Sequence, residues 1–566
     1  MSDLSFDKKT IGEIFSKKGA KFLIPDYQRP YSWDNEQCEN LWEDLKNFAF
    51  PENEGFDDKD EYFLGTIVTF KNEYDDNEVI DGQQRLVTLM LLLRAYYEAF
   101  DDKSDDNAKD IFKCIWGKNK SETDKCKIIS EVATDEDIAE FEKIMRDGAA
   151  TDKNKSLYAQ NYRYFQKKIG ELKISEFGLF STRILENCII LPIETHVQNT
   201  AFRIFTTLND RGMPLSDSDI FKSQFYKFYK ARGKDAKENF IKRWKNLEEL
   251  CNKNFHPRTG TPTDDLFMRY MYYLLAKFKT RSDTFHGLRI FYEQGNYKIL
   301  KSEQTFEDLM TLANFWNDIA LRDERRFSAR ILRRLYVLSY SPHSLWTYVV
   351  SLYFMGNRVD NLLNENNFYR FLDKITALIL MHAIANPGTH NIRRPFFTEF
   401  QNILHGNELR FSDSRQDRKF FREVLNNTKF SQSKAITRAM LTWWTFQNDK
   451  QELPLLDTKL EVEHIFAKRR AEFEPFENAE TLELLGNKSL LEKRINIRAS
   501  DYRFADKKKY YLGYTRNNKF QRGTDILELR ELAKSKIDFT ESDIRERNEK
   551  ILSSFMNYLD AHNLLK

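Results

Sequence analysis

The chain has 566 residues, of which 31% are charged and 14% aromatic, and its formal net charge is only +2. At this length we expect two or three domains with ample core material. The near-neutral total gives no global sign of a nucleic-acid-binding protein, so any such affinity must come from local patches.

Membrane insertion and secretion are both disfavoured by the sequence. The longest apolar stretches, such as residues 86–93 and 345–355, are too short or too interrupted to span a bilayer. The first residues lack the basic and apolar regions of a signal peptide. The five cysteines form no C-x-x-C spacing, which favours reduced thiols. We therefore expect a cytoplasmic protein with no membrane partner.

The first informative region is a strand–turn–helix pattern. Residues 62–69 and 78–80 predict strands from their β-branched and aromatic content. Then comes Asp81-Gly82-Gln83-Gln84-Arg85, followed by an apolar run over residues 86–100 that predicts a helix. Such a turn places backbone N–H groups and the positive end of the helix dipole together, which makes an anion site.

Two side chains of this turn suit phosphate chemistry. Arg85 can add a bidentate contact to a phosphate. Asp81 can bind a metal or orient a water molecule, which makes it a candidate catalytic residue. An ordinary strand-to-helix turn is the alternative interpretation.

Two further arginines are candidates for the same site. Arg29 lies between Tyr27 and Trp33, and this cluster either reads a base or packs in the core. Arg211 lies in a predicted tight turn that follows a predicted strand at residues 188–193. Arg211 either contacts a phosphate or pairs with a neighbouring aspartate.

The middle of the chain, residues 226–440, is mostly helical by pattern. Three of its six histidines, at positions 382, 390 and 405, have no regular metal spacing with one another, so we interpret them as structural. The apolar periodicity predicts helices at residues 235–250, 264–278, 305–321 and 328–338.

The second informative region begins with a predicted strand that ends in Glu463-His464, followed by Asn487 and Asn496. This order is typical of a one-metal ββα (HNH-type) nuclease. His464 can deprotonate the attacking water, while Glu463 and Asn496 can supply the oxygen ligands that Mg²⁺ or Mn²⁺ prefers. In HNH folds the first asparagine, here Asn487, braces the loop beneath the histidine. The alternative is that His464 is an ordinary surface or core-edge residue.

A basic stretch follows these residues. Between Lys488 and Arg522 there are eleven Lys or Arg residues and three acids, interleaved with aromatic side chains. Such a face can track phosphates, and its binding would fall steeply with salt, although a charge run can also be plain solvated surface. The candidate DNA-binding residues are Lys493, Arg494, Arg498, Arg503 and Lys507.

Both regions resemble GmrSD-type modification-dependent restriction proteins. Residues 463–507 follow the order of the family's C-terminal HNH domain, with Ala467 where proline is usual and Lys488 where leucine is usual. Residues 24–33, 63–66, 81–85 and 208–216 resemble the DGQQR domain of the GmrSD and SspE families, which is related to ParB and sulfiredoxin folds.

The resemblance implies a nucleotide site and a gated nuclease. It places Asp81-Gly82-Gln83-Gln84-Arg85 at the nucleotide phosphates. Arg29 and Arg211 are the further candidate nucleotide contacts. The implied activity is hydrolysis of GTP, ATP or another nucleoside triphosphate that controls cutting of modified DNA. Self-association is left open.

We therefore predict a mixed α+β, predominantly helical protein. The predicted parts are a ParB/sulfiredoxin-like α/β domain over residues 1–225, a helical middle over 226–440 and an HNH endonuclease domain over 441–566. The predicted function is a nucleotide-regulated, metal-dependent DNA endonuclease of anti-phage defence. The rivals are a ParB-like DNA-binding regulator with an inactive HNH module, and an RNA-directed or toxin-like nuclease.

Overall fold

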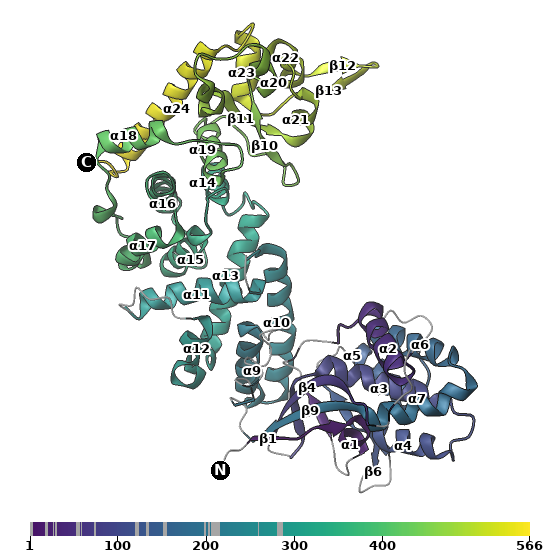
Figure 1. Ribbon diagram of the computed structural model, residues 1–566. Helices are drawn as coiled ribbons and strands as arrows, with labels where there is room; N and C mark the ends of the chain where they lie inside the picture. The colour runs from purple at the N-terminus through teal and green to yellow at the C-terminus, as the bar shows by residue number, and fades with distance from the viewer. Residues whose placement is uncertain are drawn as a thin grey trace. The chain divides into compact units, whose positions relative to one another are not determined.

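The computed structural model divides into two compact units, Met1–Ala231 and Arg232–Lys566 (Figure 1). It describes residues 4–16, 21–25, 28, 31–51, 57, 59–72, 75–118, 124–131, 135–150, 156–196, 200–201, 204, 216–257, 260–279 and 287–566. The predicted mixed and mostly helical architecture is confirmed. No described helix combines the length and the apolar content that a membrane crossing needs. The predicted division into three domains stays a prediction.

A mixed seven-stranded sheet organises the first unit. Its order is β1-β9-β4-β5-β3-β8, with β2 also paired to β9. The central strand β4 runs parallel to β9 and antiparallel to β5. The strands are β1 Leu4–Phe6, β2 Lys9–Thr10, β3 Phe22–Ile24, β4 Tyr62–Lys71, β5 Asn77–Asp81, β8 Ile128–Ser130 and β9 Cys188–Thr195, and a separate hairpin joins β6 Trp116–Lys118 to β7 Asp124–Cys126.

The helix that follows the Asp81 turn lies at the centre of this unit. Every residue of α3 from Leu86 to Tyr96 is buried, as expected for a helix that is apolar all round. It begins at Gln83, earlier than predicted, because Gly82 adopts φ 87° and completes the turn within one residue. The described helices are α1 Ile11–Ser16, α2 Asn35–Ala49, α3 Gln83–Glu98, α4 Asp106–Ile115, α5 Asp135–Asp147, α6 Leu157–Gly170, α7 Ile174–Asn187 and α9 Asp217–Lys230.

The second unit begins with a series of helices that pack on one another. The four helices predicted in the middle region correspond to α10, α11, α13 and α14, with ends shifted by a few residues. The described helices here are α10 Lys234–Asn254, α11 Pro262–Lys277, α12 Leu288–Tyr297, α13 Glu303–Ala320, α14 Ala329–Ser339, α15 Leu345–Asn357, α16 Glu365–Ala385, α17 Thr389–Leu404, α18 Arg418–Asn427 and α19 Ala435–Thr445.

A strand–strand–helix order carries the candidate nuclease residues. Strand β10 (Leu460–His464) pairs antiparallel with β11 (Lys488–Glu492), and α21 (Lys493–Ala499) follows directly. The other elements of this part are α20 Lys468–Phe473, α22 Phe504–Leu512, β12 Tyr514–Arg516, β13 Lys519–Gln521, α23 Leu527–Ser535 and α24 Glu541–Ala561. Figure 1 shows β12 and β13 extending away from the surrounding helices.

Candidate active site

Strands β10 and β11 place the candidate side chains at one end of a small sheet. Glu463 lies opposite Ser489, and His464 lies opposite Lys488. Since side chains alternate between the faces of a strand, Glu461 and Glu463 share one face of β10 while His464 lies on the other. The strand thus presents carboxylates to one side and the imidazole to the other.

The imidazole of His464 is buried among charged side chains. It is 8% exposed, and within the described residues its Nε2 has no hydrogen-bond partner. Glu483 Oε1 lies 3.9 Å away, and this carboxylate is paired with Lys468 and Lys488. Burial lowers the pKa of His464 to about 3, and the two lysines act in the same direction. The ring is therefore neutral near pH 7, as a general base requires.

This depressed pKa predicts a stability change with pH. The ordinary pKa of histidine is 6.5, so between that value and about 3 the unfolded chain binds a proton that the folded chain does not. Stability should therefore fall as the pH drops below 6.5. From about pH 7 to about pH 5 we expect wild type to lose about 2 kcal/mol more than His464→Gln. Denaturant unfolding of both proteins measures this difference, and equal losses would contradict the buried, neutral imidazole.

Asn487 fixes the turn that follows His464. Its Oδ1 accepts a hydrogen bond from the Phe466 N–H at 2.7 Å, and its Nδ2 donates to the carbonyls of Phe466 and Leu482. Its own carbonyl accepts from the Ile465 N–H at 2.9 Å. The side chain is fully buried, so it acts on the loop and does not face a substrate.

Arg547 of α24 holds the loop that carries Asn487. Its Nη1 donates to the carbonyls of Leu485, Gly486 and Lys488 at 2.8–3.1 Å. Its Nε and Nη2 pair with both oxygens of Glu528. The terminal helix is therefore part of the support of the candidate site.

Glu463 is enclosed by two donors. Its Oε1 accepts hydrogen bonds from Lys507 Nζ and from the Tyr511 hydroxyl, both at 2.7 Å. Burial raises the pKa of Glu463, and the Lys507 ammonium opposes that rise. A cation that binds Glu463 would have to share this carboxylate with Lys507 or displace it.

Asn496, which is predicted to bind a metal together with Glu463, contacts the carboxylate of Glu461. Its Nδ2 donates to Glu461 Oε2 at 3.0 Å, whereas no hydrogen bond joins it to Glu463 within the described residues. Glu461 is partly exposed, and Lys493 Nζ lies 3.9 Å from its Oε1. Glu461 is thus the more accessible oxygen donor beside Asn496.

The side chains near Asn496 include oxygen donors that suit a hard cation, but they do not form a complete coordination shell. Glu461, Glu463 and the amide oxygen of Asn496 are the donor types that Mg²⁺ prefers. Among the described residues, no three His, Cys, Asp or Glu side chains are grouped closely enough to hold a metal by themselves. Waters and substrate oxygens usually complete a Mg²⁺ shell, so this open set suits a metal bound together with a phosphate.

The predicted DNA-binding residues differ in how exposed their side chains are. Lys493 and Arg494 are exposed, and Arg498 is partly exposed. Arg503 is exposed and pairs with Glu474. Lys507 is only 1% exposed and is committed to Glu463, so in this structure it cannot contact a phosphate.

The Asp81 turn in the first unit is tightly built. Gly82 provides no capping side chain to α3, and a Cβ there would lie 2.9 Å from Ile67 Cγ1. Arg85 Nη1 donates to the Thr66 carbonyl at 3.0 Å. Burial lowers the pKa of Arg85, and Asp81 opposes that effect. Part of the guanidinium's hydrogen-bonding capacity is therefore structural.

Other residues of the turn also make contacts that hold the fold together. Gln83 and Gln84 are buried, and Gln84 Oε1 accepts from the N–H groups of Ser32 and Trp33 at 2.8 and 3.3 Å. A Cβ on Gly65 would lie 2.9 Å from Arg85 Nη2, so this glycine makes room for the guanidinium. Described residues of three segments that share the resemblance, 24–33, 63–66 and 81–85, thus meet in space around the start of α3.

Arg29 and Arg211, the other predicted nucleotide contacts, lie outside the described residues. The same holds for Tyr27 and for the turn at residues 209–212. Downstream of them, Ser216 caps α9, and its side chain accepts a hydrogen bond from the Asp219 N–H. Their proposed roles stay predictions.

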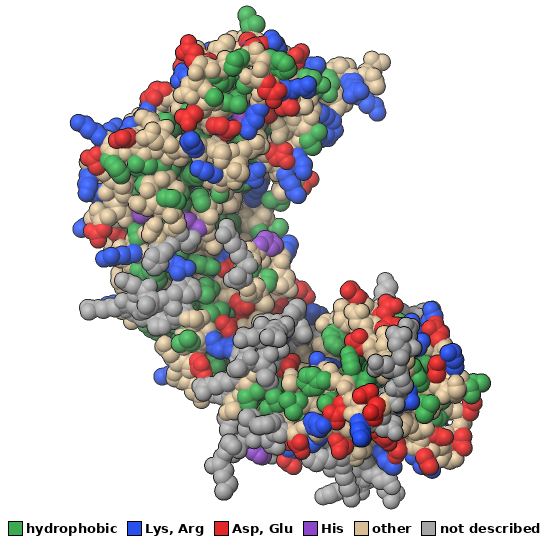
Figure 2. All heavy atoms as spheres, viewed as in Figure 1, with side chains coloured by type: hydrophobic (Ala, Val, Ile, Leu, Met, Phe, Trp, Pro, Cys, Tyr) green, Lys and Arg blue, Asp and Glu red, His purple; other side chains and the backbone are tan. Residues whose placement is uncertain are grey.

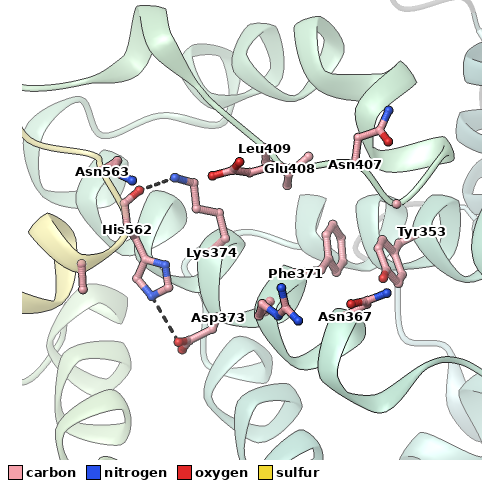
Figure 3. A pocket seen from close by; sticks show the side chains of 13 residues that line it. Tyr353, Asn367, Phe371, Asp373, Lys374, Asn407, Glu408, Leu409, His562 and Asn563 are labelled. Carbon is pink, nitrogen blue, oxygen red and sulfur yellow. Dashed lines mark hydrogen bonds and ion pairs between the residues drawn. The ribbon is translucent and has the colours of Figure 1, made fainter.

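A 420 Å³ pocket in the second unit is lined by none of the predicted residues (Figure 3). Two of its polar groups, Asp373 and His562, pair with one another. Asp373 also accepts a hydrogen bond from the Tyr558 hydroxyl and pairs with Arg334, and these two residues lie outside the lining. Burial would raise the pKa of Asp373, but His562 and Arg334 outweigh it and the pKa is lowered. These contacts tie the end of α24 to α16.

Sequence reasoning missed several residues of the nuclease segment. Glu461 carried a signal, since it stands two residues before Glu463 and shares its strand face. Glu483, Tyr511 and Arg547 carried none, because their importance comes from contacts across 19 or more residues of chain.

The comparisons with known proteins concern both regions. A family model described as the N-terminal domain of the GmrSD restriction endonuclease matches residues 11–226, and one described as the C-terminal domain of GmrSD restriction endonucleases matches residues 414–554. Together they define a two-part, restriction-type protein and span more than half of the chain. The chain belongs to the GmrSD-like restriction proteins.

The chain is also similar to an uncharacterized protein of Methanocaldococcus jannaschii. The two are 24% identical over 276 residues, which is 42% of this chain and 46% of that protein. The chain thus matches less than half the length of this curated relative.

Proposed function

We propose that this protein is a metal-dependent DNA endonuclease that restricts modified phage or foreign DNA. The observation that carries the proposal is the neutral, buried His464 at the end of β10, with Glu461 and Glu463 on the other face of that strand and Asn496 of α21 bonded to Glu461. All four lie within the range that matches the GmrSD C-terminal domain. The substrate and the cofactor are part of the proposal.

In the proposed reaction His464 accepts the proton of the attacking water. Burial holds its pKa down in the free protein, and Lys488 and Lys468 add to that effect; a DNA phosphate beside Lys468, which is half-exposed, would reduce the contribution of the lysines. The pKa would then move toward the range of an effective base. Asn487 and Arg547 keep the loop beneath the imidazole in place.

The metal would be Mg²⁺ or Mn²⁺, held by Glu461 or Glu463 together with Asn496. When bound it would stabilise charge on the scissile phosphate and on the leaving oxygen. The positive charge of Lys507 would keep the carboxylate of Glu463 ionised.

Chelation separates this proposal from a metal-free one. In excess chelator, cleavage should stop while the protein stays folded, and Mg²⁺ or Mn²⁺ should restore it. Purified protein is incubated with plain duplex DNA, modified phage DNA or RNA, with and without each triphosphate. Cutting that persists in chelator would refute the metal. Cutting of RNA alone would favour the toxin-like nuclease, and binding to DNA without any cutting would favour the regulator.

The first unit is proposed to bind a nucleoside triphosphate at the start of α3. The N–H groups of α3, Arg85 and Asp81 meet there, and the N-terminal family match includes this turn. Control of the nuclease requires two states of the protein with different nucleotide affinity. Hydrolysis that favours one state would supply that control.

Asp81→Asn should impair triphosphate turnover, because it removes the carboxylate proposed to orient water or a metal. Turnover is measured by phosphate release, with Asp110→Asn on the exposed face of α4 as the control. Arg85→Ala should weaken binding as well, but Arg85 also bonds to Thr66, so thermal unfolding is measured alongside. Normal turnover by Asp81→Asn would remove this turn from the proposed chemistry.

A further inference from the structure

The hairpin formed by β12 and β13 is a projecting, basic ribbon. Asn517 and Asn518 at its tip have φ 50° and 59°, the left-handed pair of a tight two-residue turn whose twist suits a hairpin. Residues 515–520 are all exposed, and Phe520 is 69% exposed. Figure 2 shows Lys or Arg side chains along this projection. The ribbon therefore offers its side chains to a partner.

The charges on the ribbon are unbalanced. Arg516 and Lys519 lie directly opposite one another, so they share one face. Like charges in this cross-strand position repel, and within the described residues neither has an ion-pair partner. Between Lys507 and Gly523 the chain has six Lys or Arg residues and no acid. An anionic partner would relieve the repulsion.

Aromatic rings continue from the ribbon onto α22. Tyr514 meets Tyr510 edge to face at 5.3 Å, and Tyr510 stacks on Tyr502 with an interplanar angle of 9°. Tyr502 is 49% exposed. Rings interleaved with cations are common on surfaces that bind nucleic acid.

The base of the ribbon is rigid and joined to the candidate site. A Cβ on Gly513, at φ 94°, would lie 2.7 Å from the ring of Phe520, and a Cβ on Gly523 would collide with the Tyr511 carbonyl. The Thr524 N–H donates to that carbonyl at 3.1 Å. Tyr511 also donates its hydroxyl to Glu463. The direction of the ribbon is therefore fixed relative to the carboxylate side of β10.

We propose that this hairpin lies in the major groove of double-stranded DNA and positions the duplex for cleavage. The major groove is wide enough for a two-stranded ribbon. Arg516 and Lys519 contact phosphates on its walls, and such contacts set register without reading sequence. The inference rests on the proposed function, since it takes DNA as the substrate.

The test is DNA binding by the full chain with Arg516→Gln and Lys519→Gln together. Anisotropy of a labelled duplex is measured at several salt concentrations in chelator, so that binding is separated from cutting. Loss of two phosphate contacts should lower affinity about ten- to hundredfold at about 0.1 M salt and reduce the salt slope by about 2. The matched control is Lys298→Gln with Lys301→Gln, two exposed lysines of the helical part.

The possible results distinguish a failure of the proposed ribbon–DNA contact from a failure of the proposed endonuclease function. Wild-type affinity and slope in the ribbon variant, while wild type binds and cuts DNA, would overturn the ribbon and leave the endonuclease in place. An equal loss of affinity for single-stranded DNA would overturn the groove placement. If wild type neither binds nor cuts duplex DNA, the proposed function fails first. Unchanged thermal unfolding and triphosphate turnover in the variant exclude misfolding, and Gly513→Val provides a second variant that should misdirect the ribbon while its charges remain.

Discussion

His464→Ala should reduce DNA cleavage by about 10²–10⁴-fold, which takes it below detection in an ordinary gel assay. Residues 414–554, which match the GmrSD C-terminal domain, contain no second histidine that could act as the base near neutral pH. In the second unit His562 pairs with Asp373, and His405 lies on the exposed end of α17. Triphosphate turnover and DNA binding should survive, because neither the first unit nor the basic surface is changed.

The control for this variant is His405→Ala, which removes an exposed imidazole of the same unit. Cleavage is measured at saturating Mg²⁺ with protein purified in parallel, and cells that carry each variant are challenged with phage. His464→Ala should lose protection and His405→Ala should keep it. Cutting near the wild-type rate by His464→Ala would mean that the nuclease site lies elsewhere.

Arg547→Met should lower the free energy of unfolding of the second unit by about 3–5 kcal/mol. The substitution removes the guanidinium that pairs with Glu528, and it removes one donor from each of three carbonyls of one loop, those of Leu485, Gly486 and Lys488. Since that loop carries Asn487, cleavage should be lost at a lower temperature than in wild type. Denaturant unfolding and cleavage across temperature measure the two effects.

Arg545→Met is the matched control on the same helix. Arg545 pairs with Glu541 at an exposed position, and such surface pairs contribute about 0–1 kcal/mol. A similar, small loss in both variants would show that Arg547 does not hold the loop.

The order of the elements was predictable from local pattern. The β-branched runs at residues 62–69 and 188–193 and the continuous apolar run after Arg85 have periodicities and lengths that tertiary contacts did not override. Glu463-His464 at a strand end was predictable for the same reason, since polar residues that close an apolar strand stay near its edge.

The pairing of side chains was not predictable in the same way. Lys507 looked like one more cation of a basic run, yet it lies on the buried face of α22 against Glu463. Asn496 faces Glu461, two residues from the expected carboxylate, because alternation along β10 puts both acids on one face. These side-chain pairings depend on which helix covers each face of the sheet. The spacing of residues in the chain does not determine that packing.

The two-site account is tested most directly by one paired measurement. Cleavage of modified duplex DNA and triphosphate turnover are assayed on the same preparations of wild type, His464→Ala and Asp81→Asn. The account predicts that His464→Ala loses cleavage and keeps turnover, while Asp81→Asn loses turnover. Cleavage retained by His464→Ala, or normal turnover in Asp81→Asn, would contradict it.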